Sequence, residues 1–184
     1  MTLLTRLFPR SAERIELEPW LPAARRGERT ALEQFFRAYQ PSVYALCCRM
    51  LGRTDDAEDA TQAAFVLALR ALPRFRGESS LKTWLYRIAV NECLTQLRRK
   101  TNAPLPLDER FAIADGAGRT VDRLAAQAAL ARLRMDHRTV LVLRYWEELD
   151  CEEIAAVLDI SLSATKMRLK RARDEFEKHY RGEF

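Results

Sequence analysis

The stretch CEEIAAVLDISLSATKMRLKRARDEF, residues 151–176, contains the pattern that decides the fold. Apolar residues at helical spacing predict a short helix over 152–158, a turn over 159–161 and a second helix from 162 onward. The second helix should bury one stripe of side chains, namely Leu162, Thr165, Leu169, Ala172 and Phe176. Its other positions carry cations, with no acid between 164 and 173: Lys166, Arg168, Lys170, Arg171 and Arg173. A basic helix after a tight turn is typical of a helix-turn-helix motif that recognises the DNA major groove.

A simpler alternative for this stretch is a three-helix packing module whose basic face is only solvated. Two positions depart from the usual motif. Asp159 lies in the turn where glycine is usual, and Thr165 replaces a larger aliphatic residue.

A second basic segment lies upstream, where residues 70–100 contain eight bases and two acids. A helix is predicted from Ser79 or Ser80 to Lys100, with a buried stripe made of Leu81, Leu85, Ala89, Cys93 and Leu97. A different face gathers Trp84, Arg87, Asn91, Thr95 and Arg98. An aromatic ring beside cations and an amide suits unpaired bases, which stack on the ring while the cations hold phosphates. The alternative is that the tryptophan packs at a domain edge and the bases are solvated.

An acidic cluster precedes this segment and consists of Asp55, Asp56, Glu58 and Asp59. Asp55 or Asp56 is expected to cap a helix that ends before Pro73. Its buried face should consist of Ala57, Ala60, Ala64, Ala68 and Ala71, flanked by Phe65 and Leu69. Carboxylates at a helix N-terminus are favourable because of the helix dipole, so the cluster has an ordinary explanation. Docking to a basic partner is the functional alternative. A paired-carboxylate hydrolase would need a nucleophile or metal-ligand set that the sequence does not supply.

The whole chain indicates an all-α protein with two small helical domains. Residues 101–120 contain two prolines and two glycines and are expected to form a flexible linker. It separates domains at 20–100 and 121–184, each of four helices, and an N-terminal arm of uncertain role covers 1–19. The helices of the first domain are expected near 18–26, over 28–51 with an interruption or kink near Pro41, over 55–72 and over 79–100. The net charge of +5 suits a nucleic-acid partner.

No apolar run reaches the length of a membrane span, and the N-terminal stretch lacks a signal-peptide cleavage site, so a cytoplasmic protein without membrane insertion is expected. Cys47, Cys48, Cys93 and Cys151 form no metal-binding spacing and are expected to be reduced thiols, with a metal site or catalytic thiol as the alternative. No cofactor and no catalytic residue are predicted.

Three segments, in order, resemble the extracytoplasmic-function (ECF) sigma factors of bacteria. DAEDATQAAF (56–65) is similar to the family's polymerase-docking helix, and FRGESSLKTWLYRIAVNECLTQLRRK (75–100) to its promoter-melting segment. VLVLRYWEELDCEEIAAVLDISLSATKMRLKRAR (140–173) resembles its helix-turn-helix domain. The resemblance spans residues 20–176 and implies a non-enzymatic factor that binds core RNA polymerase, directs it to promoter DNA and promotes melting. It also implies a dedicated anti-sigma factor as a partner.

The resemblance implies roles for matching positions. The clamp helices of the largest polymerase subunit would contact Asp56, Glu58, Asp59 and Gln62. Melted minus-ten bases would be held by Phe75, Ser79, Ser80, Lys82, Trp84, Arg87, Asn91 and Thr95. The minus-thirty-five duplex would be contacted by Lys166, Met167, Lys170 and Arg171, with Arg168 and Arg173 on phosphates. The linker would follow the polymerase's active-site and RNA-exit channels.

The sequence departs from the family pattern at three places. Ala63 and Ala64 replace an acid–hydroxyl pair, which could reshape docking, whereas Met135-Asp136 and Cys151 are expected to be packing variations. Two other classes remain open. A helix-turn-helix regulator that acts without polymerase would not need Trp84 and Asn91 on a basic face. A nucleic-acid enzyme such as a recombinase would need a carboxylate triad, which the sequence lacks.

Overall fold

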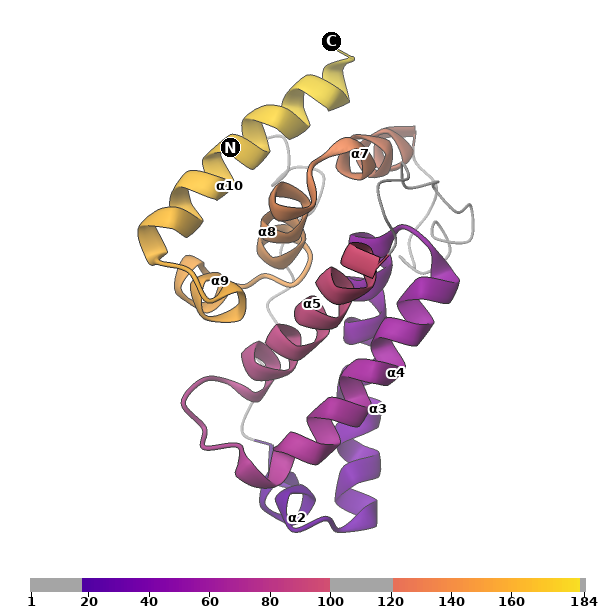
Figure 1. Cartoon of the computed structure of the whole chain (residues 1–184), viewed down its shortest axis with the longest axis vertical. Coiled ribbons are helices and arrows are strands. Elements are labelled where there is room, and N and C mark those ends of the chain that lie inside the picture. Colours follow the sequence, from indigo (N-terminus) through magenta and orange to yellow (C-terminus); the bar gives the residue numbers. More distant parts are fainter. Residues whose placement is uncertain (1–17, 100–120, 183–184) are drawn as a thin grey trace.

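The computed structural model describes residues 18–99 and 121–182, and every regular element within these ranges is a helix. The expected linker and nearly all of the expected N-terminal arm therefore lie outside the described residues. The N-terminal unit contains α2 (Leu21–Arg25), α3 (Arg29–Leu51), α4 (Thr54–Ala71), a short 3-10 turn (Leu72–Arg74) and α5 (Leu81–Arg99). The C-terminal unit contains α7 (Val121–Arg132), α8 (Met135–Tyr145), α9 (Cys151–Leu158) and α10 (Leu162–Arg181). The predicted all-α, two-part architecture is confirmed (Figure 1).

Helix α3 is continuous through Pro41, so of the two expected outcomes, an interruption or a kink, the interruption does not occur. Pro41 is exposed, and the Ser42 hydroxyl donates a hydrogen bond to the carbonyl of Tyr39 at 3.0 Å. The proline ring therefore lies on the solvent side, where the loss of one backbone donor does not disturb the buried face. Gly52 ends the helix as predicted, because its φ of 70° is left-handed and its N–H donates to the Cys48 carbonyl.

The start of α4 differs from the prediction that an aspartate caps it. Arg53 occupies the capping position without a side-chain hydrogen bond, and Asp55 and Asp56 lie within the first turn. Their carboxylates therefore stabilise the helix through a favourable interaction with its dipole, and they do not cap it. Helix α5 begins as expected, with the Ser80 hydroxyl accepting a hydrogen bond from the N–H of Thr83 at 3.0 Å.

The helix-turn-helix geometry of α9 and α10 is set by local side-chain chemistry. Asp150 caps α9 and exchanges hydrogen bonds with Glu153 in a capping box. Asp159, in the turn, adopts the left-handed φ of 54° that explains why glycine is usual there. Ser161 then caps α10 by accepting from the N–H of Ala164 at 3.2 Å.

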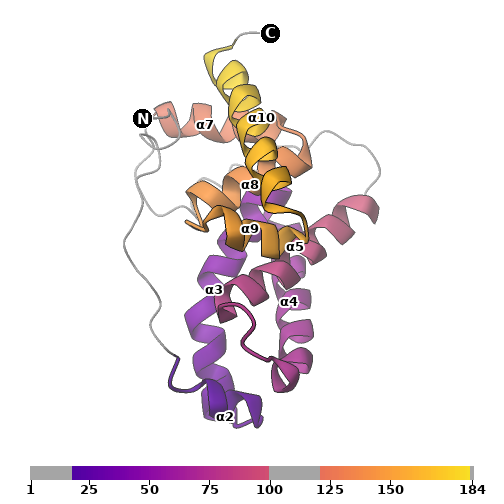
Figure 2. The same cartoon turned by 90° about the vertical axis from the view of Figure 1, so that its left-hand side faces the viewer.

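The two units share one continuous hydrophobic core. In the N-terminal unit α3, α4 and α5 pack on one another, and in the C-terminal unit α10 packs on α7, α8 and α9. Between the units, α5 packs on α9 and α3 packs on α8 (Figures 1 and 2). The sequence predicted two domains separated by a flexible linker and gave no indication of this contact between them. The contact determines which surfaces of the two units are exposed.

Candidate nucleic-acid and partner surfaces

Helix α10 presents its cations on an open face. The predicted buried stripe is confirmed for Thr165, Leu169, Ala172 and Phe176, whereas Leu162 is half-buried. Lys166, Lys170 and Arg171 are exposed, and Arg168 and Arg173 are half-buried along the sides. Met167, which only the family resemblance identified, is 55% exposed. α10 lies along the outer edge of the molecule (Figure 1), and the exposed part of its basic face consists of Lys166, Met167, Lys170 and Arg171.

The departure at Thr165 has a simple structural explanation. Its side chain is fully buried, and its hydroxyl donates to the carbonyl of Ser161 at 3.1 Å. The hydroxyl is thus satisfied within the first turn of α10, and a smaller side chain than the usual aliphatic residue still fits the core.

A cavity of about 410 Å³ lies at the start of α5, lined by Arg74, Phe75, Arg76, Glu78, Ser79, Thr83, Trp84, Arg87 and Ala156. Trp84 forms one wall and packs against Phe75, with ring centroids 5.1 Å apart at 49°. Arg74 and Arg76 are exposed on its rim. An aromatic wall with cations around it has the chemistry to hold an unstacked base and its phosphates.

The structure brings together only some of the residues predicted for this face. Phe75, Ser79, Trp84 and Arg87 line the cavity, whereas Asn91 and Thr95 do not. The Ser80 hydroxyl is occupied in capping α5 and bonds to Thr83 at 2.7 Å. Arg74 and Arg76 were not among the residues predicted for this face, although their positions on either side of Phe75 were a usable signal.

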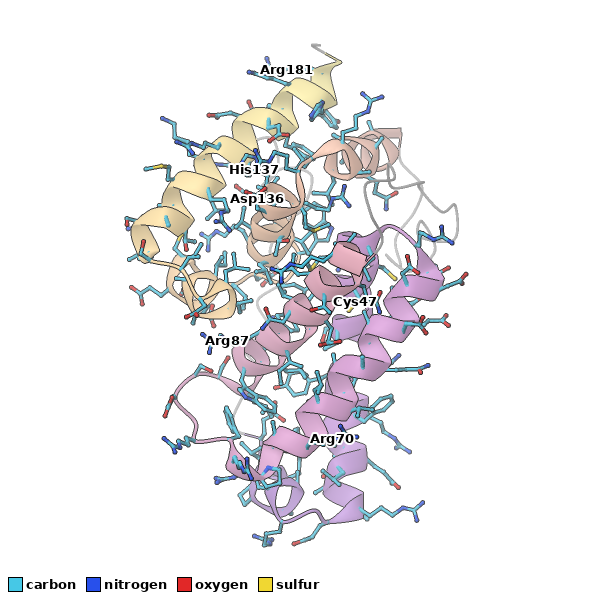
Figure 3. All side chains as sticks on the ribbon, viewed as in Figure 1. Cys47, Arg70, Arg87, Asp136, His137 and Arg181 are labelled. Atoms are coloured by element: carbon cyan, nitrogen blue, oxygen red, sulfur yellow. The ribbon has the colours of Figure 1, made fainter. Side chains whose placement is uncertain are left out.

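The C-terminal unit reaches this face of α5. The Lys82 ammonium donates to the carbonyl of Glu147 at 2.8 Å, and the Thr83 hydroxyl lies 3.5 Å from the Glu153 carboxylate. Arg87 points toward α9 and lies 3.4 Å from the Asp159 carboxylate (Figure 3). Part of the predicted single-strand surface is therefore in contact with the other unit.

Glu147, in the loop between α8 and α9, is the centre of this contact and was not predicted. Its carboxylate is 5% exposed and lies 3.2 Å from the guanidinium of Arg49 on α3. The Tyr86 hydroxyl donates a hydrogen bond to the same carboxylate. Burial, followed by the negative charge of Glu147, raises the pKa of Tyr86 well above its ordinary value.

A second polar link joins the units at Arg138 on α8. Its guanidinium is buried and donates to carbonyls at the end of α7 and to the carbonyl of Met50 on α3, the last at 3.0 Å. Burial lowers the pKa of Arg138 to about 10, so the group remains charged near neutral pH.

The four residues of α4 that the resemblance assigns to docking divide into two groups. Glu58, Asp59 and Gln62 are exposed on one face, as docking requires. Asp56 instead turns inward: its side chain is 11% exposed and lies 3.6 Å from the guanidinium of Arg53. The alanine face is buried except for Ala71, which is half-buried, and Leu69, expected to flank that face, is 40% exposed.

The cysteines are free thiols, as predicted. Cys47, Cys48 and Cys93 are buried and Cys151 is half-buried. Burial raises the pKa of Cys48 to about 11, whereas a hydrogen bond from Cys93 lowers that of Cys47. Within the described residues no cluster of metal-ligating side chains occurs, and none of the described helices has the length and apolarity of a membrane span.

Comparison with known proteins agrees with this arrangement. Residues 35–103 match Sigma-70 region 2, and residues 129–175 match Sigma-70 region 4. The chain is 34% identical to the ECF RNA polymerase sigma factor SigM of Mycobacterium tuberculosis, over 80% of this chain and 76% of that protein. It is 30% identical to the ECF RNA polymerase sigma factor SigW of Bacillus subtilis, over 85% of this chain and 92% of that protein.

Among solved structures, the fold is similar to the sigma factor RpoE of Bartonella quintana in complex with the anti-sigma factor NepR. The TM-score is 0.66 at 23% identity, and the match covers 83% of this chain and 98% of that one. The matched regions define a sigma-70-type protein. The chain belongs to the ECF RNA polymerase sigma factors, a class of transcription-initiation factors that direct RNA polymerase to promoters.

Proposed function

We propose that this sigma factor divides its work among three surfaces: α4 binds polymerase, the cavity at the start of α5 holds melted minus-ten bases, and α10 recognises the minus-thirty-five duplex. The observation that carries the proposal is the chemical difference between the surfaces. One is acidic, one combines an aromatic wall with cations, and one is a cationic helix face. Each suits a different partner, and one chain presents all three.

The polymerase contact consists of the exposed residues Glu58, Asp59 and Gln62. Asp56 supports them from beneath, because its carboxylate is held by Arg53 and is almost buried. Reversing one exposed charge tests this contact. Asp59→Arg should weaken binding to core polymerase by at least about a hundredfold, since like charges across an interface cost several kcal/mol.

The matched control for that substitution is Asp174→Arg, the same charge reversal at an exposed position of α10. It should leave binding to core polymerase unchanged. Affinity can be measured by fluorescence anisotropy, with circular dichroism to verify that both variants fold. Equal losses for the two variants would mean that net charge, and not the α4 face, governs binding.

The cavity beside Trp84 would receive a base that has left the stack. Extruding a base costs a few kcal/mol, which a preformed pocket offsets by stacking and by contacts with its edge. Arg74, Arg76 and Arg87 would hold the adjacent phosphates, with Ser79 and Lys82 at the margin. Asn91 and Thr95, farther along α5, would contact the DNA beyond the cavity.

Helix α10 would enter the major groove with Lys166, Met167, Lys170 and Arg171 toward base edges. Arg168 and Arg173 lie at the sides of this face, where phosphates would be. Melting is then a shift of population toward the open promoter, because the protein binds that state better. This mechanism needs binding energy alone, so we propose no catalytic residue and no cofactor.

The factor would act in the cytoplasm, where polymerase and promoters are, and an anti-sigma factor would restrain it. The deciding experiment is run-off transcription with reconstituted core polymerase on a genomic library. We expect discrete new start sites that require both proteins. Duplex binding by a stable dimer without polymerase would instead support a helix-turn-helix regulator.

A further inference from the structure

We infer that Gln96 on α5 is a positioning residue for polymerase docking, because its amide holds the turn of α4 that carries Glu58 and Asp59. The inference rests on the proposed function of α4 and adds to it a residue that does not itself touch polymerase. Neither the buried stripe nor the DNA face predicted for α5 included Gln96. Its role depends on the neighbouring helix, which no pattern within α5 reports.

The amide of Gln96 bonds to the backbone of α4, which packs along α5 (Figures 1 and 2). Its NH2 group donates to the carbonyl of Asp56 at 3.1 Å, and its oxygen accepts from the N–H of Ala60 at 3.0 Å. In an α-helix each N–H bonds to the carbonyl four residues earlier, so these two groups belong to one turn of α4. One side chain therefore holds both ends of that turn.

Small side chains on the buried face of α4 allow this close approach. Ala57, Ala60 and Ala64 are fully buried, and a methyl group leaves the helix backbone within reach of a side chain from α5. The next carbonyl along the turn, that of Ala57, accepts a hydrogen bond from the buried hydroxyl of Thr61 at 2.6 Å. Side chains thus bind two successive carbonyls on the inner side of the turn.

Glu58 and Asp59 lie between the two positions that Gln96 holds, and both are exposed to solvent. Asp56, at the start of the turn, is directed inward to Arg53. A surface whose groups are already fixed in the bound arrangement loses less conformational entropy on binding, and this increases its affinity. Without the bonds from Gln96, polymerase itself would have to order the turn.

The acidic part of the docking surface is confined to this turn. Both exposed carboxylates that we propose to bind polymerase lie in it. After Gln62, the exposed positions of α4 carry no acid and consist of Val66, Leu67, Leu69 and Arg70. A displacement of one turn would therefore move both carboxylates together, and no other acid further along the helix could replace them.

The test uses Gln96→Met, which preserves the length of the side chain and removes both hydrogen bonds. Gln127→Met is the matched control, because Gln127 is also a half-buried glutamine but lies on α7. Fluorescence anisotropy measures the affinity of each full chain for core polymerase, and chemical denaturation measures its free energy of unfolding. Gln96→Met is measured again in an Asp59→Ala background, where one of the positioned carboxylates is missing.

We expect Gln96→Met to weaken binding to core polymerase about tenfold, the scale of one or two hydrogen bonds, and Gln127→Met to leave binding unchanged. In the Asp59→Ala background the factor should fall to about threefold or less, because changes that act through one contact are not additive. The change in unfolding free energy should be the same in both backgrounds. A residue that only stabilised the fold would lower the affinity by the same factor with and without the Asp59 carboxylate.

Two results would overturn the inference. If Gln96→Met binds polymerase normally while Asp59→Arg does not, the turn needs no support from α5. If the affinity falls by equal factors in the two backgrounds, Gln96 contributes to stability and does not position the carboxylates. Failure of the proposed function is distinguishable from both, because Asp59→Arg would then bind polymerase as well as the unmodified chain, and the inference would fail with it.

Discussion

The two proposed DNA surfaces of this protein differ in how they are built. The face of α10 belongs to a single helix that lies on the surface of the molecule (Figure 2), and three of its cations, Lys166, Lys170 and Arg171, are exposed. The surface at the start of α5 is assembled from the 3-10 turn, the following loop, the helix itself and α9 of the other unit. One surface depends on local sequence, whereas the other depends on tertiary packing.

This difference has a consequence for regulation. The α10 face can meet duplex DNA in this arrangement, because Lys166, Lys170 and Arg171 are exposed on it. The α5 surface is partly in contact with Glu147, Glu153 and Asp159. Recognition of the duplex element can therefore precede capture of the melted element, in the order that promoter opening requires.

The largest expected effect removes the support of the α10 face. Phe176 is fully buried under α10, and Phe176→Ala should destabilise the C-terminal unit by about 3–5 kcal/mol. In a chemical denaturation followed by circular dichroism, that unit should then unfold before α2–α5. The control is Phe36→Ala, the same deletion at a side chain that is 47% exposed, which should cost far less. If both variants instead show one unfolding transition, shifted by the same amount, the prediction is wrong. The shared core would then make the two units unfold as one cooperative body.

The next effect separates melting from duplex recognition. On a closed promoter, Trp84→Ala should make the free energy of open-complex formation about 1–3 kcal/mol less favourable, which is the usual contribution of one stacked base. A template with a premelted minus-ten bubble should rescue at least part of the loss. Trp84→Phe preserves a ring against Phe75 and should lose less. Equal losses on both templates would contradict the melting role.

Helical spacing predicted most of the α10 surface, because it decides which side chains of a single helix face outward, whereas Met167 was identified only by the family resemblance. Thr165 and Phe176 were placed correctly in the buried stripe. The α5 surface was predicted only in part. Trp84 was recognised, but the contact of Glu147 with Arg49 joins residues that are 98 positions apart in the chain, and no local pattern specifies it.

Two local features differ from what the sequence suggested, and both have physical reasons. Pro41 was expected to interrupt or kink α3, but the rest of the helix is held by its packed face, and no interruption occurs. The family resemblance assigned Asp56 to docking together with Glu58 and Asp59, and that role stays a prediction. The carboxylate of Asp56 turns inward to Arg53, because only some positions of a helix can face solvent.

On the α10 surface, a substitution at Arg171 should have an effect of comparable size. Arg171→Ala should weaken promoter binding by about 1–3 kcal/mol, the usual cost of losing one good base contact. The loss should be equal on closed and premelted templates, because both retain the minus-thirty-five duplex. Holoenzyme binding measured at one fixed salt concentration is the assay, since phosphate contacts depend on salt. If the premelted bubble restores binding by Arg171→Ala, the α10 surface does not act on duplex DNA alone, and the proposed division between the two surfaces is wrong.

The smallest expected effect lies at Asp159, in the turn that orients α10. An L-residue in the left-handed region costs about 1–2 kcal/mol, and aspartate is among the side chains that tolerate it best. Glycine removes that cost but adds about 0.5–1 kcal/mol of backbone entropy lost on folding. The exposed pair with Arg87 contributes little, since the Asp159 side chain is 93% exposed. Asp159→Gly should therefore stabilise the chain by about 0.5 kcal/mol. Asp159→Ala removes the same carboxylate, but alanine still pays the cost of the left-handed conformation. This variant should therefore destabilise the chain. Midpoints of chemical denaturation compare the two variants, and equal midpoints would mean that the carboxylate, and not the backbone conformation, sets the stability of the turn.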